Sequence, residues 1–154
     1  MKISELLTDA LIKVDLEGID KEEVIEELIE LLVRMGRITD RRAAREAIMT
    51  REARQSTGIG RGVAIPHGKS STIGQLTAAL GISKRGIEYD ALDGEPVKVV
   101  FLLLAEADNP GPHVEALASL ARLFKTPNFI ERLLAARTPR ELYDVIVAEE
   151  EKEE

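Results

Sequence analysis

Two histidines are the residues of this chain best suited to chemistry near neutral pH. His67 lies in the run 65–69 (Ile-Pro-His-Gly-Lys), just after a glycine-rich stretch, and His113 is the other. Because proline fixes φ and glycine frees it, we expect a tight loop that holds the His67 side chain exposed and fixed in direction. Such an imidazole suits a nucleophile or a proton carrier, although a loop histidine without any role is the alternative.

His113 and Arg51 are the residues that would act beside His67. His113 follows Pro112, where we expect a helix to begin, and a helix N-terminus favours anions over added positive charge. A neutral imidazole there can meet a phosphoryl group, but its helical spacing from Leu117 also fits a histidine at the edge of the core. Arg51 can clamp phosphate oxygens through its planar fork, or it is an ordinary solvated arginine.

Several familiar sites do not fit the sequence. Residues 58–62 (Gly-Ile-Gly-Arg-Gly) lack the third glycine and the preceding strand of a dinucleotide-binding fingerprint. Residues 62–70 resemble a phosphate-binding P-loop, but they have one residue too many between the glycines and contain histidine and proline. With two histidines and no cysteine, the chain also offers poor material for a structural zinc site, so we predict no metal and no cofactor.

Composition limits the class of protein and of partner. The chain has 154 residues, 44% hydrophobic and 32% charged, which is typical of one globular domain with an aliphatic core. Its net charge of −7 argues against nucleic acid as the main partner. No apolar run is long enough for a transmembrane helix or secretory signal, and the absence of cysteine fits the cytoplasm. We therefore expect a cytoplasmic protein without membrane insertion.

Two helices are predicted in the first third of the chain. Asp20 and Glu23 form a capping box, and apolar residues follow at helical spacing as far as Gly36, a natural stop. Thr39 is placed to cap a second helix over 40–54, which would end beside the glycine-rich stretch.

Strands are predicted in the middle of the chain. Residues 55–71 are interpreted as a loop in which 63–65 can form a short strand, and the apolar run 76–82 is a second strand. A turn at 93–96 leads into 97–104, whose almost continuous apolar run predicts a central strand covered on both faces.

The last third of the chain is predicted to be helical. A helix starts near Pro112, and Thr126 and Thr138 each precede a proline in the manner of a helix cap. Glu141 completes a capping box with Thr138. The acidic residues 149–154 are interpreted as a fraying, solvated tail.

The order of these elements predicts an α/β (α+β) fold. Helices at both ends of the chain and strands between them indicate one sheet covered on both sides. We place this single domain at residues 1–148, before the acidic tail.

With these residues in view, the chain resembles a known family. Residues 51–53 (Arg-Glu-Ala), 56–60 (Ser-Thr-Gly-Ile-Gly) and 63–68 (Val-Ala-Ile-Pro-His-Gly) are similar to the active-site stretch of the enzyme IIA domains of the bacterial phosphoenolpyruvate-dependent sugar phosphotransferase system. The resemblance is to the fructose/mannitol class, including its nitrogen-regulatory members. It continues through 91–97 to the helix that contains His113, and so covers nearly the whole chain.

The resemblance implies a fold, an activity and a set of site residues. The fold is a mixed β-sheet between helices, and the activity is that of a phosphotransferase component. His67 matches the phosphorylated histidine, His113 the histidine that orients it, and Arg51 the active-site arginine. Phosphate would arrive from the histidine phosphocarrier protein and leave to an enzyme IIB. From the chemistry, loop amides at Gly68 and Lys69 would help to bind phosphate.

One residue departs from the family pattern. Arg61 stands where mannitol-type members carry glutamate and nitrogen-regulatory members often carry asparagine. The added positive charge would either bind the phosphoryl group more tightly or reshape the surface on which partners dock.

Three functions stay open at this point. The first is a fructose-type transport component that passes phosphate to an enzyme IIB. The second is a nitrogen-regulatory switch that binds regulatory target proteins, where phosphorylation adds negative charge to a binding surface. The absence of a fused IIB or membrane domain from this sequence slightly favours the second. The third, a binding module that never carries phosphate, is disfavoured because His67, His113 and Arg51 are all present.

Overall fold

The organising element of the fold is strand β6 (Val97–Glu106), which is apolar and buried along nearly its whole length. In the computed structural model, which describes residues 1–152, β6 pairs antiparallel with β5 and parallel with both β3 and β4. The resulting six-stranded mixed sheet has the order β1-β5-β6-β3-β2, with β4 attached to β6 further along the strand. The other strands are β1 (Ile12–Lys13), β2 (Gly58–Gly60), β3 (Val63–Ala64), β4 (His67–Ser70) and β5 (Thr77–Ile87).

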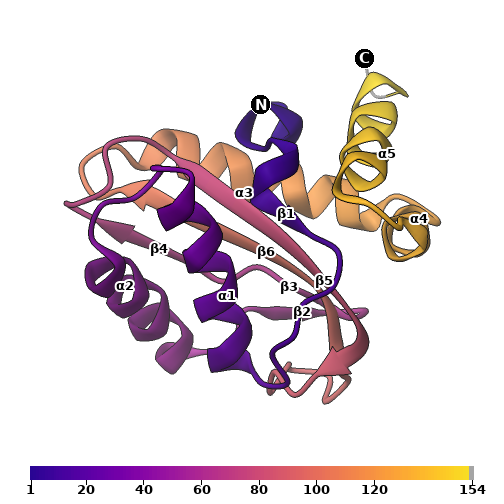
Figure 1. Ribbon diagram of the computed structural model, residues 1–154, viewed down its shortest axis with the longest axis horizontal. Coiled ribbons are helices and arrows are strands. Elements are labelled where there is room, and N and C mark those ends of the chain that lie inside the picture. The colour runs from indigo at the N-terminus through magenta and orange to yellow at the C-terminus, as the bar shows by residue number, and fades with distance from the viewer. Residues whose placement is uncertain (153–154) are drawn as a thin grey trace.

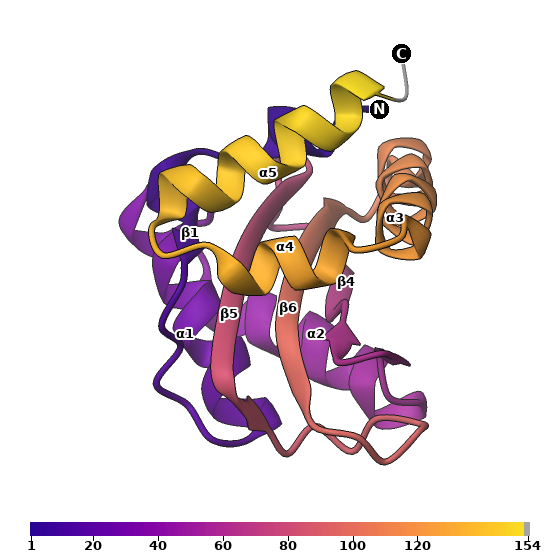
Figure 2. The same ribbon diagram turned by 90° about the vertical axis from the view of Figure 1, so that its right-hand side faces the viewer.

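Helices cover both faces of this sheet, as Figure 1 and Figure 2 show. One face carries α1 (Lys21–Arg34) and α2 (Arg41–Arg54), and the other carries α3 (Pro110–Lys125), α4 (Phe129–Ala135) and α5 (Pro139–Lys152). Two short 3₁₀ helices, η1 (Ile3–Leu6) and η2 (Asp9–Leu11), precede β1. The predicted α/β fold with a sheet between helices is confirmed. No helix within residues 1–152 is long and apolar enough to cross a membrane.

The helix starts follow the predicted capping pattern in part. The Asp20 carboxylate accepts from the Glu23 backbone N–H at 2.9 Å, and the Glu23 carboxylate accepts from the Ile19 N–H at 3.1 Å. The cap of α2 is Asp40, whose carboxylate accepts from the Ala43 N–H at 3.0 Å, so the prediction of Thr39 is wrong by one residue. A carboxylate next to the free amides of the first turn is as good a cap as a hydroxyl.

The later helices also shift their starts. α3 begins at Pro110, before the predicted Pro112. α4 does not begin at Thr126, because the chain first makes a turn in which Asn128 adopts a left-handed φ of 66°. The cap of α5 is confirmed, since the Thr138 hydroxyl accepts from the Glu141 N–H at 3.1 Å.

The short strand expected at 63–65 is present as β3, but the interpretation of the rest of 55–71 as a loop is wrong, because the segment also contains β2 and β4. Both β3 and β4 gain their pairing from the edge of β6, a long-range partner that local sequence cannot reveal. β5 likewise continues past the predicted end at residue 82 to Ile87, after a shift in register.

The prediction of a fraying tail is wrong for residues 149–152. Helix α5 continues to Lys152, and both Glu149 and Glu150 are buried. Glu149 forms an ion pair with Arg132, and the Glu150 carboxylate accepts from backbone N–H groups of η1 at the other end of the chain. Residues 153–154 lie outside the described part, and the domain bounds 1–148 stay a prediction.

Candidate active site

His67 is the first residue of β4, and so it lies in a strand and not in the tight loop expected from Pro66 and Gly68. The carbonyl of Pro66 accepts from the Leu103 N–H at 3.0 Å, which anchors this end of β4 to β6. The ring Nδ1 of His67 lies 2.7 Å from the carbonyl oxygen of Ile65. A carbonyl can only accept, so Nδ1 carries the hydrogen and Nε2 holds the lone pair of the neutral ring.

His113 lies directly against this imidazole. Its ring centroid is 5.3 Å from that of His67, at an interplanar angle of 70°. The His113 side chain comes from the first turns of α3 and is only 6% exposed, and within residues 1–152 its Nε2 has no hydrogen-bond partner. Buried ring nitrogens normally have a hydrogen-bond partner. The unpaired Nε2 of His113 therefore indicates a site for a group that enters the cleft. His113 is therefore a buried histidine and a neighbour of His67 at once.

Both imidazoles are kept neutral by their surroundings. Burial is the largest cause that lowers the pKa of His67, and the charges of Arg51 and Arg54 lower it further against the opposing effects of Ile65 and Glu52. Burial, followed by the charges of His67 and Lys69, lowers the pKa of His113 to about 4. A neutral His67 keeps its Nε2 lone pair available at pH 7.

Arg51 lies in the last turn of α2, where its Nη1 donates to the backbone carbonyl of Gln55 at 2.8 Å. This bond directs the guanidinium while its other N–H groups stay available. Helix α2 can come close to β4 because Gly68 has no side chain: a Cβ there would lie 2.7 Å from the carbonyl carbon of Ala47. Gly68 thus lets the arginines of α2 approach His67.

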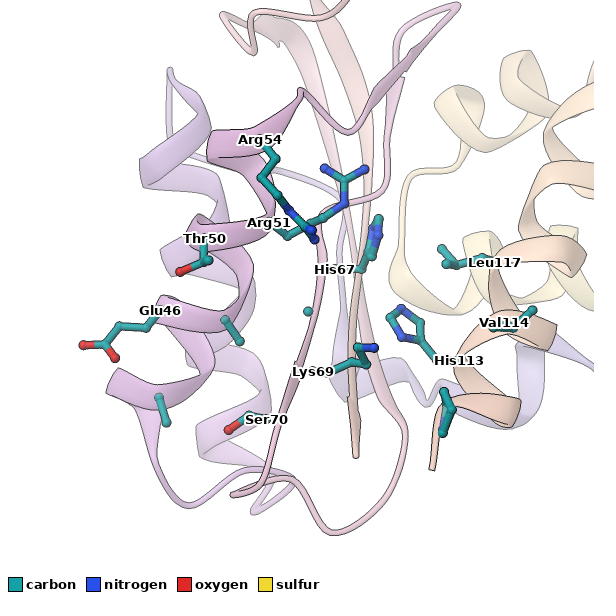
Figure 3. A pocket seen from close by; sticks show the side chains of 14 residues that line it. Glu46, Thr50, Arg51, Arg54, His67, Lys69, Ser70, His113, Val114 and Leu117 are labelled. Carbon is teal, nitrogen blue, oxygen red and sulfur yellow. The ribbon is translucent and has the colours of Figure 1, made fainter. Parts of the chain in front are cut away.

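These elements enclose an open cleft of about 630 Å³ between α2, β4 and the start of α3. Figure 3 shows Arg51 and Arg54 entering from one side, His113 from the other, and His67 and Lys69 between them. The cleft is lined by Ala43, Glu46, Ala47, Thr50, Arg51, Arg54, His67, Gly68, Lys69, Ser70, Pro110, His113, Val114 and Leu117. The structure therefore brings together all five predicted site residues: His67, His113, Arg51, Gly68 and Lys69.

A buried network behind the cleft was not predicted. The Glu52 carboxylate accepts from the Thr57 backbone N–H at 2.9 Å and from the Tyr89 hydroxyl at 2.7 Å, and Lys21 Nζ lies 3.7 Å away. The network joins the end of α2 to the segment that leads into β2. Burial and the Glu52 charge raise the pKa of Tyr89, which keeps its hydroxyl protonated as a donor. Glu52 appears in the sequence only as a charged residue beside Arg51, so its burial gave no local signal.

Arg61 lies outside the set of residues that line the cleft. Its Nη1 donates to the backbone carbonyl of Phe124 at 2.9 Å, at the C-terminal end of α3, where a cation is favourable. The backbone of Arg61 is left-handed, with φ of 59°. Of the two expectations for this residue, binding of the phosphoryl group finds no support in this position.

Comparison with known proteins agrees with the resemblance. The family model for the phosphoenolpyruvate-dependent sugar phosphotransferase system, EIIA 2, matches residues 5–149. The chain is 41% identical over 146 residues to the PTS system fructose-specific EIIABC component of Bacillus subtilis (strain 168), covering 95% of this chain but only 23% of that relative. It is 35% identical over 144 residues to the PTS system fructose-specific EIIA component of Haloferax volcanii, covering 94% of each.

Nitrogen regulatory proteins are similar as well. The chain is 32% identical over 148 residues to the Nitrogen regulatory protein of Bradyrhizobium diazoefficiens, covering 95% of each. The crystal structure of Nitrogen Regulatory Protein IIA-Ntr from Neisseria meningitidis matches with a TM-score of 0.86 at 33% identity, over 94% of this chain and 98% of that one. The IIA mannitol structure from Escherichia coli, with a TM-score of 0.78 at 21% identity, shows the same fold over 91% and 98% of the two chains.

Proposed function

Because the chain belongs to the EIIA 2 family of the phosphoenolpyruvate-dependent sugar phosphotransferase system, we propose that it carries a phosphoryl group on Nε2 of His67. The observation that supports this most is the 2.7 Å contact between His67 Nδ1 and the Ile65 carbonyl. This contact places the hydrogen on Nδ1 and leaves the Nε2 lone pair available, and the ring lines a cleft that also contains His113 and Arg51.

The proposed step is an in-line transfer from one imidazole to another. The Nε2 lone pair of His67 attacks the phosphorus of a phosphohistidine on the donor, the histidine phosphocarrier protein. A new P–N bond forms as the donor P–N bond breaks, and the donor nitrogen keeps that electron pair, so that a donor ring with a hydrogen on its other nitrogen leaves as neutral imidazole. The Nδ1 hydrogen of His67 stays on Nδ1 and is donated to the Ile65 carbonyl, so the phosphorylated ring takes up the positive charge that the donor ring loses. Such a transfer needs positioning and charge stabilisation more than covalent help from the protein.

The surrounding residues would stabilise the transferred group. Arg51 would donate to its oxygens, and His113 would donate through Nε2 in the tautomer that places the hydrogen there. The backbone amides around Gly68 and Lys69, together with the Lys69 ammonium, would provide further positive potential. Because both histidines are neutral at pH 7, the site attracts an anion through these cations without protonating its own nucleophile.

We propose that the chain transfers the phosphoryl group to an enzyme IIB in the cytoplasm, as one step of fructose-type sugar uptake. The fructose-specific relatives support this acceptor. A solved complex of enzyme IIA-mannitol with phosphorylated enzyme IIB from Escherichia coli shares the fold. The open cleft and the exposed Val114 at its rim suit a transient interface.

The similarity to Nitrogen Regulatory Protein IIA-Ntr supports a second candidate. In that function the phosphorylated site is a switch: about 1.5 to 2 added negative charges at the cleft change which regulatory protein binds. The same His67 chemistry serves both functions, and only the fate of the phosphoryl group differs.

The test is to incubate the chain with phosphoenolpyruvate, enzyme I and the histidine phosphocarrier protein, and then to add a fructose enzyme IIB. We expect one acid-labile, base-stable phosphate by intact mass, absent from His67→Ala, that moves to the IIB. Labelling that persists in His67→Ala would overturn the site. A stable label that the IIB does not remove would favour the regulatory function.

A further inference from the structure

We infer that Arg54 is a second guanidinium ligand of the phosphoryl group on His67, an inference that rests on the proposed function. Arg54 ends helix α2 one turn beyond Arg51, so both side chains project from the same side of the helix. Arg54 lines the cleft together with His67, and Figure 3 shows the two arginine side chains lying beside each other next to the His67 ring.

Within residues 1–152, Arg54 has no competing partner in the unphosphorylated protein. The side chain is exposed, and the part of the chain that the structure describes contains no hydrogen bond or ion pair to its guanidinium. The nearby carboxylate of Glu52 is already used, since it accepts from Thr57 and Tyr89 in the buried network. All five N–H donors of Arg54 are therefore available to an anion that enters the cleft.

The phosphoryl group requires more donors than the predicted residues offer. Its three oxygens carry close to two negative charges near neutral pH. Arg51 uses one of its donors on the Gln55 carbonyl, and a neutral His113 has at most one N–H to give from Nε2. Arg54 provides a second fork from the same wall of the cleft, and a guanidinium can bind two of these oxygens at once.

Electrostatics favours this arrangement only when an anion is present. Arg51 and Arg54 place two positive charges at the C-terminal end of α2. The helix dipole stabilises each cation there, but the two guanidinium groups repel each other. A phosphoryl dianion between them converts that repulsion into attraction. Both arginines then stabilise the dianionic form of the phosphoryl group. Removing either one makes that form less stable relative to the protonated form.

The test is a ³¹P NMR titration of the chain phosphorylated on His67 with phosphoramidate, which requires no partner protein. A bound cation favours the dianionic form of the phosphoryl group. We therefore expect Arg54→Gln to raise the proton affinity of that group about threefold, as for the loss of a unit charge a few ångströms away in a largely solvated site. Arg54→Lys, which keeps the charge, should recover part of this effect. Arg85→Gln, which removes an exposed arginine of β5 that does not line the cleft, should leave the titration unchanged.

Each outcome decides the matter. Equal titration curves for wild type and Arg54→Gln would overturn the role of Arg54 while the phosphohistidine itself still supports the proposed function. If the two titration curves are equal but Arg54→Gln accepts phosphate more slowly from the phosphocarrier protein, Arg54 acts in partner docking. That result would also overturn its role as a ligand of the phosphoryl group. If wild type forms no phosphohistidine on His67, the proposed function fails and this inference fails with it. As a control for folding, the melting temperature of Arg54→Gln should equal that of wild type.

Discussion

At the scale of single residues, the chemistry of this protein depends on which ring nitrogen of His67 is free. The Ile65 carbonyl accepts from Nδ1 and so leaves the Nε2 lone pair free for the proposed phosphoryl transfer. His113 contributes a second imidazole that burial keeps neutral and whose Nε2 has no partner within residues 1–152. The pair is thus prepared for an anionic group and resists protonation.

The lowered pKa of His113 predicts a loss of stability in mild acid. Its pKa is about 4 in the folded chain against an ordinary 6.5, so the unfolded chain binds the proton first as the pH falls. The stability that the folded chain gains from a neutral His113 is fully present above pH 6.5. It decreases as the pH drops towards 4, because the unfolded chain then binds a proton that the folded chain does not. We expect wild type to lose about 2–3 kcal/mol more than His113→Gln over that window.

Urea unfolding at pH 7 and at pH 4.5 measures this difference. Carboxylates titrate in both proteins over the same range, so only the gap between wild type and His113→Gln reports on the imidazole. Parallel losses in the two proteins would contradict the burial of a neutral His113.

Residue types were easier to predict than residue geometry. His67, His113 and Arg51 stand out in the sequence because imidazoles are rare in it and the flanking motifs are specific. The free nitrogen of His67 could not be predicted, because it depends on one backbone carbonyl. Arg61 was placed near the chemistry by its sequence position, but its guanidinium binds Phe124, which is distant along the chain.

At the scale of elements, the site depends on the close approach of α2 to β4. Gly68 allows this contact, and the buried Glu52 network fixes the end of α2 against Thr57 and Tyr89. Because Arg51 directly precedes Glu52, the network also restrains the turn from which Arg51 and Arg54 project.

The Glu52 network predicts a large effect from a nearly isosteric change. In Glu52→Gln, the NH₂ of the new amide faces groups that themselves donate hydrogen bonds, and an NH₂ cannot accept them. Buried hydrogen-bonding groups are then left without partners, so we expect the free energy of unfolding to fall by about 2–4 kcal/mol. Tyr89→Phe removes a single donor and should cost about 1 kcal/mol. Chemical unfolding measures both.

The matched control is Glu46→Gln, on the same helix, because Glu46 is exposed and forms a surface ion pair with Arg42. That change should alter stability by less than about 0.5 kcal/mol. If Glu52→Gln behaves like Glu46→Gln, the network does not restrain the end of α2.

Long, strongly patterned elements were predicted well and short ones were not. The helix 40–54 has apolar residues on one face, and the strand 97–104 has an almost continuous apolar run, so each could be predicted from its own residues. By contrast β2 and β4, with three and four residues, were not predicted, although the two-residue β3 falls within the predicted 63–65, and the pairing of β4 depends on β6. Local sequence therefore suggested a loop where the fold builds the strand that carries His67.

At the scale of the whole molecule, the two ends of the chain are joined beside the sheet. The Glu150 carboxylate in α5 accepts from the backbone N–H groups of Ile3 and Ser4. Figure 2 shows α5 lying next to the N-terminal segment. The acidic composition of 149–154 suggested a solvated tail, because a single sequence gives no sign that one of several glutamates is buried against distant amides.

This junction predicts unequal effects from two neighbouring glutamates. Glu150→Ala leaves two backbone donors of η1 without their acceptor and should lower the free energy of unfolding by about 1–3 kcal/mol. Glu151→Ala removes an exposed carboxylate and should change it by less than about 0.5 kcal/mol. Thermal unfolding of the two variants side by side checks this, and equal melting temperatures would contradict a role for Glu150 in joining the ends.

The proposed function requires that His67 accept the phosphoryl group on Nε2. The most direct test is a long-range ¹H–¹⁵N correlation spectrum of the chain phosphorylated by its phosphocarrier protein, because the pattern of ring couplings distinguishes the two nitrogens. We predict one phosphorylated histidine, His67, with phosphorus on Nε2 and the hydrogen still on Nδ1. Phosphorus on Nδ1, or a label on His113 in place of His67, would contradict the mechanism derived from the Ile65 contact.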